Sequence, residues 1–142
     1  MGWSSQLTDM YLGWVARRHM QISRLEGSVG NSPILMISGF GAYRTLITEI
    51  GLHVLEQQGD DEATSKISAR VKAIEVPLGD FRPEQLKIRI EAGLSGPSPL
   101  NTIVRRYRRE PSPLVRDVAR GWRTGRIDDV LQGDFDLIGQ QS

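Results

Sequence analysis

The residues in this sequence with the clearest chemical potential are clustered arginines. Within residues 105–126 the only opposing carboxylates are Glu110 and Asp117, and the cluster has eight members: Arg105, Arg106, Arg108, Arg109, Arg116, Arg120, Arg123 and Arg126. Planar guanidinium groups bind phosphates and carboxylates, often through two parallel hydrogen bonds. The cluster therefore predicts a surface that contacts an anionic partner.

Three interpretations of this cluster remain open. It can be a solvated face that the four aspartates of residues 127–142 partly neutralise, a surface for phosphate or nucleic acid, or a surface for an acidic protein. Tyr107 and Trp122 are interspersed among the arginines, but their spacing places them on the apolar face of their elements. We therefore predict that both rings lie in the core and do not stack on bases.

A second candidate is the turn Gly39-Phe40-Gly41, which follows an apolar run and precedes a helical pattern. Glycines at such a turn let backbone N–H groups approach a phosphate, as in dinucleotide-binding proteins. Arg44 stands where that motif needs a small residue for helix packing, and the turn has no Walker-type lysine. Gly39 and Gly41 are kept as an alternative anion-binding turn, with nucleotide binding as its function.

Groups that could carry out catalysis or bind a metal are scarce. The chain has no cysteine, which excludes a thiol nucleophile, and its only imidazoles, His19 and His53, lie in no metal-binding or triad signature. His53 is expected on a helix with Glu49 and Glu56 at i−4 and i+3, where side-chain pairing would support its charged form. We predict no catalytic residue, no metal site and no cofactor, and thus a protein that is not an enzyme.

The first half of the chain predicts two helices around one buried strand. Met10 and Trp14 share one face of a helix over residues 5–18. Residues 33–38 form a short apolar run bounded by turn residues, which is typical of a strand covered on both faces. After the glycine turn, apolar residues at helical spacing from Leu46 to Leu55 predict a central helix, with Gly59 placed to end it.

Other stretches are predicted as strands or left undecided. Residues 19–25 fit a strand or an extension of the first helix, and we favour the helix. Residues 67–76 alternate with one slip in phase, which suggests a bulge, although residues 62–76 also fit a helix. Residues 85–92 alternate cleanly and are the clearest strand in the chain. The last two strands are expected to form an antiparallel hairpin.

The C-terminal third, residues 94–142, is predicted to be a basic helical subregion with an acidic tail. The sequence PSPL begins at Pro97 and again at Pro111, each time with a serine that can cap a helix and a proline suited to its first position. Two short arginine-rich helices are expected to follow. Arg116, Arg120 and Arg123, at i, i+4 and i+7, would share one ridge of the second helix.

Length and composition bound the architecture. With 142 residues, 39% hydrophobic and 25% charged, the chain predicts one ordinary globular domain over residues 1–142. We expect an α+β fold in which a small, mainly antiparallel sheet (33–38, 67–76, 85–92) is packed by an N-terminal helix, a central helix and the C-terminal pair. The net charge of +1 is too small to hold the whole molecule to nucleic acid, so any binding charge must be local.

The sequence predicts a protein outside the membrane. No run approaches the ~18–20 consecutive apolar residues that span a bilayer. The first twenty residues place their charges in the reverse order of a secretory signal, so export by that route is not expected. We expect no membrane insertion and a soluble location, either the cytoplasm or the interior of a viral particle or large assembly.

Together these features favour a non-enzymatic structural subunit of a larger assembly, whose arginines contact an acidic partner. The partners would be other copies of the chain or other subunits of the assembly. By analogy of fold class alone, a viral or phage component such as a tail or head-tail connector protein fits this description. The alternatives are a small nucleic-acid-binding protein that uses the arginine cluster, and a nucleotide-binding protein that uses the glycine turn.

Overall fold

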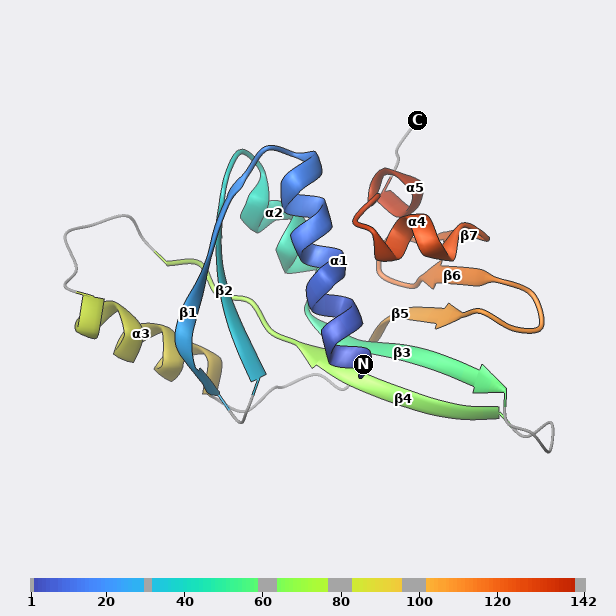
Figure 1. Cartoon of the computed structure of the whole chain (residues 1–142), viewed down its shortest axis with the longest axis horizontal. Coiled ribbons are helices and arrows are strands. Elements are labelled where there is room, and N and C mark those ends of the chain that lie inside the picture. Colours follow the sequence, from blue (N-terminus) through green and yellow to red (C-terminus); the bar gives the residue numbers. More distant parts are fainter. Residues whose placement is uncertain (1, 30–31, 59–63, 77–82, 96–101, 140–142) are drawn as a thin grey trace.

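A computed structural model describes five segments of the chain: 2–29, 32–58, 64–76, 83–95 and 102–139. They form two sheets with helices around them (Figure 1). The strands of the smaller sheet are β1 (Gln21–Val29) and β2 (Ser32–Ser38). Those of the larger sheet, in the order β4-β3-β5-β6-β7, are β3 (Gly51–Gln58), β4 (Thr64–Val71), β5 (Ile103–Arg108), β6 (Leu114–Asp117) and β7 (Trp122–Thr124). Among the described strands only β3 and β5 pair in parallel, so the predicted α+β single-domain fold with a mainly antiparallel sheet is confirmed.

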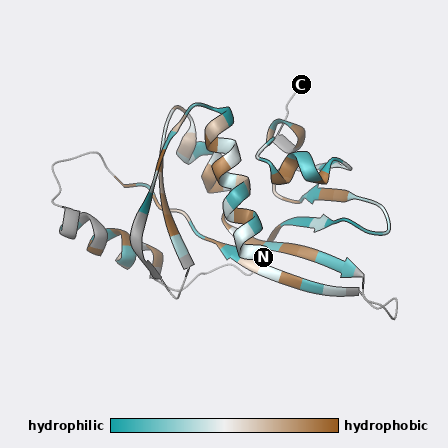
Figure 2. Ribbon diagram, in the orientation of Figure 1, coloured by the Kyte–Doolittle hydropathy of each residue, from teal (hydrophilic) through white to brown (hydrophobic). Residues whose placement is uncertain are grey.

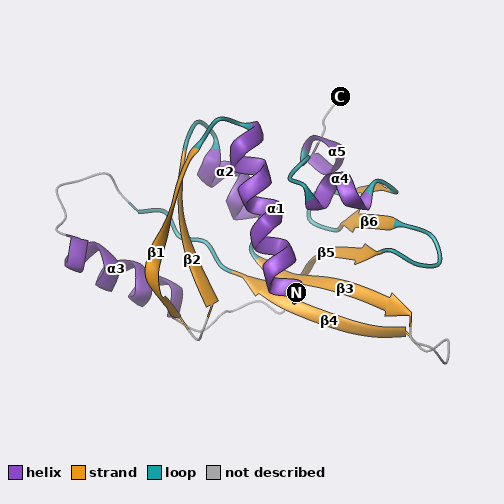
Figure 3. Ribbon diagram, in the orientation of Figure 1, coloured by secondary structure: helices purple, strands orange, loops and turns teal. Residues whose placement is uncertain are grey.

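The helices are α1 (Trp3–Arg17), α2 (Ala42–Leu46), the 3-10 turn η1 (Ile47–Glu49), α3 (Pro83–Ser95), α4 (Ile127–Leu131) and α5 (Asp136–Gly139). The amphipathic helix predicted over residues 5–18 is confirmed as α1, which buries Met10 and Trp14. Figure 3 shows α1 between the β1–β2 pair and the larger sheet. It contacts α4, β4 and β1, and so joins the two sheets.

Two glycines set how closely α1 approaches the turn after α4. A Cβ on Gly13 would lie 2.2 Å from the backbone oxygen of Gln132, and a Cβ on Gly133 would lie 2.1 Å from the backbone nitrogen of Trp14. Gly133 also has a φ of +97°, a conformation that residues with a side chain disfavour. The backbone of α1 therefore packs directly against the backbone of the turn after α4, and a side chain at either glycine would prevent this contact.

The stretch at residues 19–25, for which we favoured a helix, is a strand. α1 ends at Arg17, and His19 has a φ of +55°, which breaks the helix before β1 begins. β1 then pairs with β2 in antiparallel fashion, and α3 packs on β1. The strand predicted at residues 33–38 is confirmed as β2, but it belongs to the smaller sheet.

The strand predicted at residues 85–92 is wrong, because this segment lies inside helix α3. Ile88 is 69% exposed whereas Ile90 is 3% exposed, so alternate residues do not share a face as they would in a strand. Pro83 occupies the first helical position, which suits a proline, and residues with good helix propensity follow it. These start signals outweigh the alternation of apolar residues.

The strand predicted at residues 67–76 is only partly correct. β4 ends at Val71, and residues 72–76 have no regular structure. β4 pairs with β3 without a shift in register, so the predicted bulge and the hairpin with residues 85–92 are both wrong. The slip in the apolar phase marks the end of the strand.

The predicted central helix is wrong beyond its first turns. The helical segment ends at Glu49, and β3 begins at Gly51, whose φ is +139°. A right-handed helix cannot continue through such a residue, so the chain turns into a strand. His53 and Leu55 are then buried on β3.

The predicted C-terminal pair of arginine-rich helices is also wrong, because both segments are strands. From Arg105 onward burial alternates on β5: Arg105 and Tyr107 are buried, while Arg106 and Arg108 are partly exposed. Because the buried residue Arg105 is hydrophilic, the hydropathy of the sequence does not show the two-residue alternation that is typical of a strand. Figure 2 accordingly shows much of β5 as hydrophilic, although the strand lies inside the sheet.

The serine and proline pairs that were predicted to start those helices are not seen to do so. Ser112 and Pro113 precede β6 and cap no helix. Ser98 and Pro99 lie outside the described residues. In its described part the region 94–142 holds the last residues of α3, the three strands β5, β6 and β7, and the short helices α4 and α5.

The inner face of the larger sheet packs against α1 and α4. Leu55, Tyr107 and Val115 share one hydrophobic core with residues of both helices, and Trp122 packs against that core. The predicted core position is thus confirmed for Tyr107, while Trp122 is partly buried at the edge of the core. Within the part of the chain that the structure describes, none of the helices combines the length and the apolar character that a bilayer crossing needs.

Candidate functional site

The eight arginines do not form one face, and the structure divides them into three groups. These are a buried pair (Arg105, Arg120), a pair bound to the first turn of α4 (Arg109, Arg126) and four residues on the sheet face opposite the core (Arg106, Arg108, Arg116, Arg123). The outward-facing helical ridge expected from the sequence is therefore wrong. Its period assumed a helix, whereas the residues alternate between two faces of a sheet.

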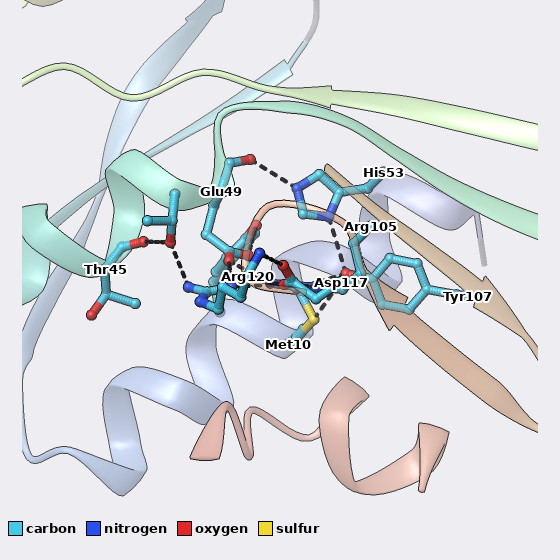
Figure 4. A network of polar contacts seen from close by, with 10 residues as sticks. Met10, Thr45, Glu49, His53, Arg105, Tyr107, Asp117 and Arg120 are labelled. Atoms are coloured by element: carbon cyan, nitrogen blue, oxygen red, sulfur yellow. Dashed lines mark hydrogen bonds and ion pairs between the residues drawn. The ribbon is translucent and has the colours of Figure 1, made fainter. Parts of the chain in front are cut away.

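The buried pair belongs to a cluster in which two guanidinium groups meet two carboxylates (Figure 4). Arg105 is fully buried; its Nε donates to Asp117 Oδ2 at 2.9 Å, and its Nη2 donates to Glu49. Arg120 Nη1 lies 2.8 Å from both Glu49 Oε2 and Asp117 Oδ2. The four charges balance inside the protein.

The four charged residues come from separate parts of the chain. Glu49 lies in η1, Arg105 on β5 and Asp117 at the end of β6, while Arg120 lies in the turn that leads to β7. Asp117 Oδ1 also accepts a hydrogen bond from the backbone N–H of Arg120 at 2.7 Å, which holds that turn. The cluster thus ties the first half of the chain to the C-terminal strands.

His53 and Tyr107 extend the cluster as a chain of hydrogen bonds. His53 Nε2 lies 2.8 Å from the backbone oxygen of Glu49, which can only accept, so this nitrogen carries the proton. Nδ1 then accepts from the Tyr107 hydroxyl at 3.0 Å, and the hydroxyl oxygen accepts from Arg105 Nη1 at 2.8 Å. The helical pairing of His53 with the Glu49 and Glu56 side chains is therefore wrong.

Burial and the neighbouring charges shift several pKa values in this cluster. Burial, together with the charge of Arg105, lowers the pKa of His53 to about 4. Burial alone would raise the pKa of Glu49, but the charges of Arg105 and Arg120 lower it to about 2. Burial raises the pKa of Tyr11, whose hydroxyl donates to Glu49 Oε1 at 2.9 Å. At neutral pH the cluster holds an ionised Glu49, a neutral His53 and a neutral Tyr11.

This buried cluster is closed to ligands. Glu49, His53 and Arg105 have no exposed surface, and every buried side-chain nitrogen or oxygen among the described residues has a hydrogen-bond partner. Shifted pKa values often mark functional sites, but structural ion pairs produce them too. In the same described part of the chain, no group of carboxylates and imidazoles could hold a metal ion. The geometry fits a structural role.

The second group of arginines binds carboxylates of the C-terminal helices. Arg109 Nη1 lies 2.6 Å from Asp128 Oδ1, and Arg126 Nε lies 2.8 Å from Asp129 Oδ2. Both aspartates lie in the first turn of α4, where the helix dipole favours them. The acidic tail therefore neutralises these two arginines.

The third group occupies the sheet face opposite the core, which we call the outer face. Its described residues near the arginines are Glu56, Arg106, Arg108, Leu114, Arg116 and Arg123. The antiparallel register places Arg106 directly opposite Arg116, and Arg116 directly opposite Arg123. We call these three residues, one on each of β5, β6 and β7, the arginine row.

The arginine row concentrates positive charge without matching carboxylates. Residues directly opposite on one sheet face have Cβ atoms about 4.5–5.5 Å apart, and like charges there are destabilising. Arg106 makes a long ion pair with Glu56, with 3.4 Å between nitrogen and oxygen. Arg116 and Arg123 are exposed and have no ion-pair or hydrogen-bond partner among the described residues. The positive charge of Arg116 and Arg123 is therefore not balanced by a carboxylate of the described residues.

A hollow of about 120 Å³ lies beside the row, and it is lined by Glu56, Arg106, Arg108, Leu114 and Arg116. Arg108 is held in place because its Nε donates to the backbone oxygen of Ser112 at 3.1 Å. Three cations and one carboxylate thus surround this hollow.

A larger hollow of about 290 Å³ at the end of α1 is lined by Arg17, Arg18, Gly133, Asp134, Phe135 and Asp136. Its charges are balanced within the chain. Arg17 lies 3.9 Å from Asp134, and Arg18 pairs with Asp136. This hollow therefore offers less attraction to an anion than the outer face does.

The glycine turn joins β2 to α2, as the sequence predicted for this strand, turn and helix. Gly41 has a φ of +76°, and a Cβ on Gly39 would lie 2.4 Å from Met20 Cγ. The fold alone therefore explains why both positions are glycine. Among the strands that the structure describes, β2 pairs with β1 alone, in antiparallel fashion, and α2 has five residues. These surroundings differ from the parallel strand and helix unit that binds dinucleotides. Nucleotide binding at this turn stays a prediction.

The sequence indicated the arginines, but it did not indicate the carboxylates that decide which arginines are buried. Glu49 and Asp117 are the carboxylates that draw Arg105 and Arg120 inside, and they lie 56 and 12 residues from Arg105. No local pattern reports a contact over 56 residues. The available signal was the alternation on β5, where Arg106 and Arg108 take one face and Arg105 takes the other.

Comparisons with known proteins bear on the fold alone. No family model matches the sequence, and no curated protein matches it. Among solved structures, RF2 of Thermus thermophilus is similar to this chain, with a TM-score of 0.55 and 15% sequence identity. The match covers 94% of this chain and 60% of that chain, so this chain spans less than two thirds of its length. At this identity the likeness shows a shared fold.

Proposed function

We propose that this chain is a non-enzymatic subunit of a larger assembly and that its outer face binds an acidic partner. The arginine row is the observation that supports this function. Its like charges stand opposite one another, and in the isolated chain this arrangement costs stability. A partner that brings carboxylates to the row would remove the repulsion, so binding would restore the stability that the isolated chain loses there.

The extent of the row favours an acidic protein surface over nucleic acid. Adjacent strands lie ~4.7–4.9 Å apart, so three strands place the row within a width of roughly 10 Å. Strong sequence-independent binding to nucleic acid comes from many phosphate contacts. Four of the eight arginines in the cluster are already neutralised within the chain. The remaining charge suits a short acidic segment or patch on another copy or another subunit.

Nucleic acid is the second candidate, because guanidinium groups bind phosphates as well as carboxylates. It would use the same outer face, so the two candidates differ in the partner and not in the residues. A viral or phage particle remains one setting for the first candidate, by analogy of fold class alone.

The native mass of the purified chain, measured by sedimentation across protein concentration and salt, separates these candidates. We expect a larger species with other copies of the chain or with poly-glutamate, and we expect Arg116→Gln/Arg123→Gln to abolish it. A chain that stays strictly monomeric with poly-glutamate, and that shifts only with an added oligonucleotide, would overturn the proposal in favour of nucleic acid.

A further inference from the structure

We infer that the hollow beside the arginine row is a site for one oxyanion, a phosphoryl group or a carboxylate, and that Glu56 competes with this ligand for Arg106. This inference rests on the proposed function, because it names the place where the acidic partner is held most tightly. It also adds a device that the proposed function does not need: a carboxylate of the chain that weakens binding.

Three arginines from two strands line this hollow. Arg106 and Arg108 are two residues apart on β5 and so share the outer face, and Arg116 lies opposite Arg106 on β6. Leu114, opposite Arg108, supplies an apolar wall. The volume of about 120 Å³ suits one small group and not an extended ligand.

The donors differ in how firmly the chain itself holds them. Arg108 is fixed through Ser112, because its Nε donates to the backbone oxygen at 3.1 Å and its Nη2 lies 3.5 Å from Oγ. Arg116 has no ion-pair or hydrogen-bond partner among the described residues and is exposed. The side chain of Arg108 is therefore held at one side of the hollow, whereas the guanidinium of Arg116 can reorient to bind a ligand.

Glu56 holds Arg106 only weakly. The distance of 3.4 Å between Arg106 Nη1 and Glu56 Oε1 exceeds the ~2.7–2.9 Å of a good charge-assisted hydrogen bond. Both side chains reach solvent, with 36% of Arg106 and 20% of Glu56 exposed. An oxyanion in the hollow could take two hydrogen bonds from the same guanidinium and replace this contact. With one carboxylate against three cations, the lining keeps an excess of positive charge for the ligand.

The test uses the side-chain Nε–Hε signals of the arginines in NMR titrations of the full chain, at low ionic strength. Inorganic phosphate is the probe for a phosphoryl group, and acetate is the probe for a carboxylate. We expect saturable shifts with at least one of them in the wild type. Removal of the competing carboxylate in Glu56→Gln should tighten binding about 3- to 5-fold, the size of a weak exposed ion pair.

Two variants control this expectation. Glu75→Gln makes the same change of charge at an exposed glutamate that does not line the hollow, and it should bind each probe as the wild type does. Arg116→Gln should weaken binding about 5- to 10-fold, as the loss of one charged hydrogen-bond donor predicts. A tighter response to phosphate than to acetate assigns the phosphoryl group, and the reverse assigns the carboxylate.

Shifts that stay linear with both probes, or a Glu56→Gln variant that binds no tighter than Glu75→Gln, would overturn the inference. Poly-glutamate binding that depends on Arg116 and Arg123 would then still support the proposed function. Conversely, poly-glutamate binding that is unaffected by those two residues would overturn the proposed function, whatever the small anions do. The two failures are therefore distinguishable.

Discussion

Arg106 on β5 lies directly opposite Arg116 on β6, on the face of the sheet that points away from the core. The buried side of the same two strands fixes this relationship, because Arg105 stands opposite Asp117 and donates to it there. Side chains alternate along a strand, so a buried pair at one position obliges its neighbours to face outward. The buried ion cluster thus sets the register that builds the arginine row.

The repulsion within the row predicts that Arg116→Glu stabilises the isolated chain. The new carboxylate would stand between Arg106 and Arg123, and an opposite-charge cross-strand pair contributes about 0.2–1 kcal/mol. We expect a rise of that size in the free energy of unfolding by urea at low salt, and a smaller rise at high salt, because salt screens exposed charges.

The matched control for this variant is Arg24→Glu. Arg24 is an exposed arginine on β1, and its partner in the register, Leu35, is uncharged. It should show no comparable gain. An Arg116→Glu chain that is less stable than the wild type at every salt concentration would contradict the repulsion that we assign to the row.

The buried cluster predicts a large loss of stability for Arg105→Met. The change leaves the carboxylates of Glu49 and Asp117 inside the protein with Arg120 as their remaining cation. Removing one partner of a buried ion pair costs about 3–5 kcal/mol, and urea unfolding would measure this loss. Arg109→Met breaks an exposed pair with Asp128 and should cost less than about 1 kcal/mol. Equal losses in both variants would mean that the cluster adds nothing beyond a surface pair.

The lowered pKa of His53 predicts that the chain loses stability in mild acid. Its folded pKa is about 4, whereas an unfolded histidine has a pKa of about 6.5. Below about pH 6.5 the unfolded chain takes up a proton that the folded chain does not, so stability falls as the pH drops toward 4. At pH 5 this loss should be about 2 kcal/mol relative to neutral pH.

Urea unfolding of the wild type and of His53→Gln at pH 5, 7 and 9 checks this expectation. The variant should lose less stability than the wild type between pH 7 and pH 5, because the group that discriminates between the folded and unfolded states is gone. Between pH 7 and pH 9 the two chains should keep a constant difference. Parallel losses in both chains down to pH 5 would place the acid sensitivity elsewhere.

The close approach at Gly133 predicts that an alanine there is much worse than an alanine at Gly121. Both glycines have positive φ, but a Cβ at Gly121 meets no atom within 4 Å, whereas one at Gly133 lies 2.1 Å from a backbone nitrogen. Gly121→Ala should cost roughly 1 kcal/mol, from its backbone conformation alone. Gly133→Ala should cost roughly 3 kcal/mol, because α1 and the turn after α4 must separate. Thermal unfolding of both variants would measure the difference, and similar losses would contradict this packing.

Local patterns predicted those elements whose buried face is apolar. The stripe that contains Met10 and Trp14 predicted α1, and the bounded apolar run predicted β2. Hydropathy patterns failed where a charged residue is buried. Because Arg105 counts as a surface residue in such a pattern but is buried on β5, the alternation of a strand was hidden and a helix was predicted. They also failed at α3, where apolar residues alternate but helix start signals decide the structure.

The candidate site was predictable as a set of residues but not as an arrangement. The density of arginines indicated an anion-binding surface, and the outer face retains four of the eight. Which four remain outside depends on Glu49, which reaches Arg105 across 56 residues of chain. It also depends on the parallel pairing of β3 with β5, a long-range contact that no window of sequence reports.

The most direct test of the outer face is the affinity for fluorescent poly-glutamate, measured by anisotropy at low and at physiological salt. We predict that Arg116→Gln/Arg123→Gln weakens binding by at least about 10-fold at low salt, because two charged donors are lost. Arg17→Gln/Arg18→Gln removes the same charge at the end of α1, away from the row, and should change affinity far less. Equal losses in the two double variants would show that only net charge matters and would contradict a binding site on the outer face.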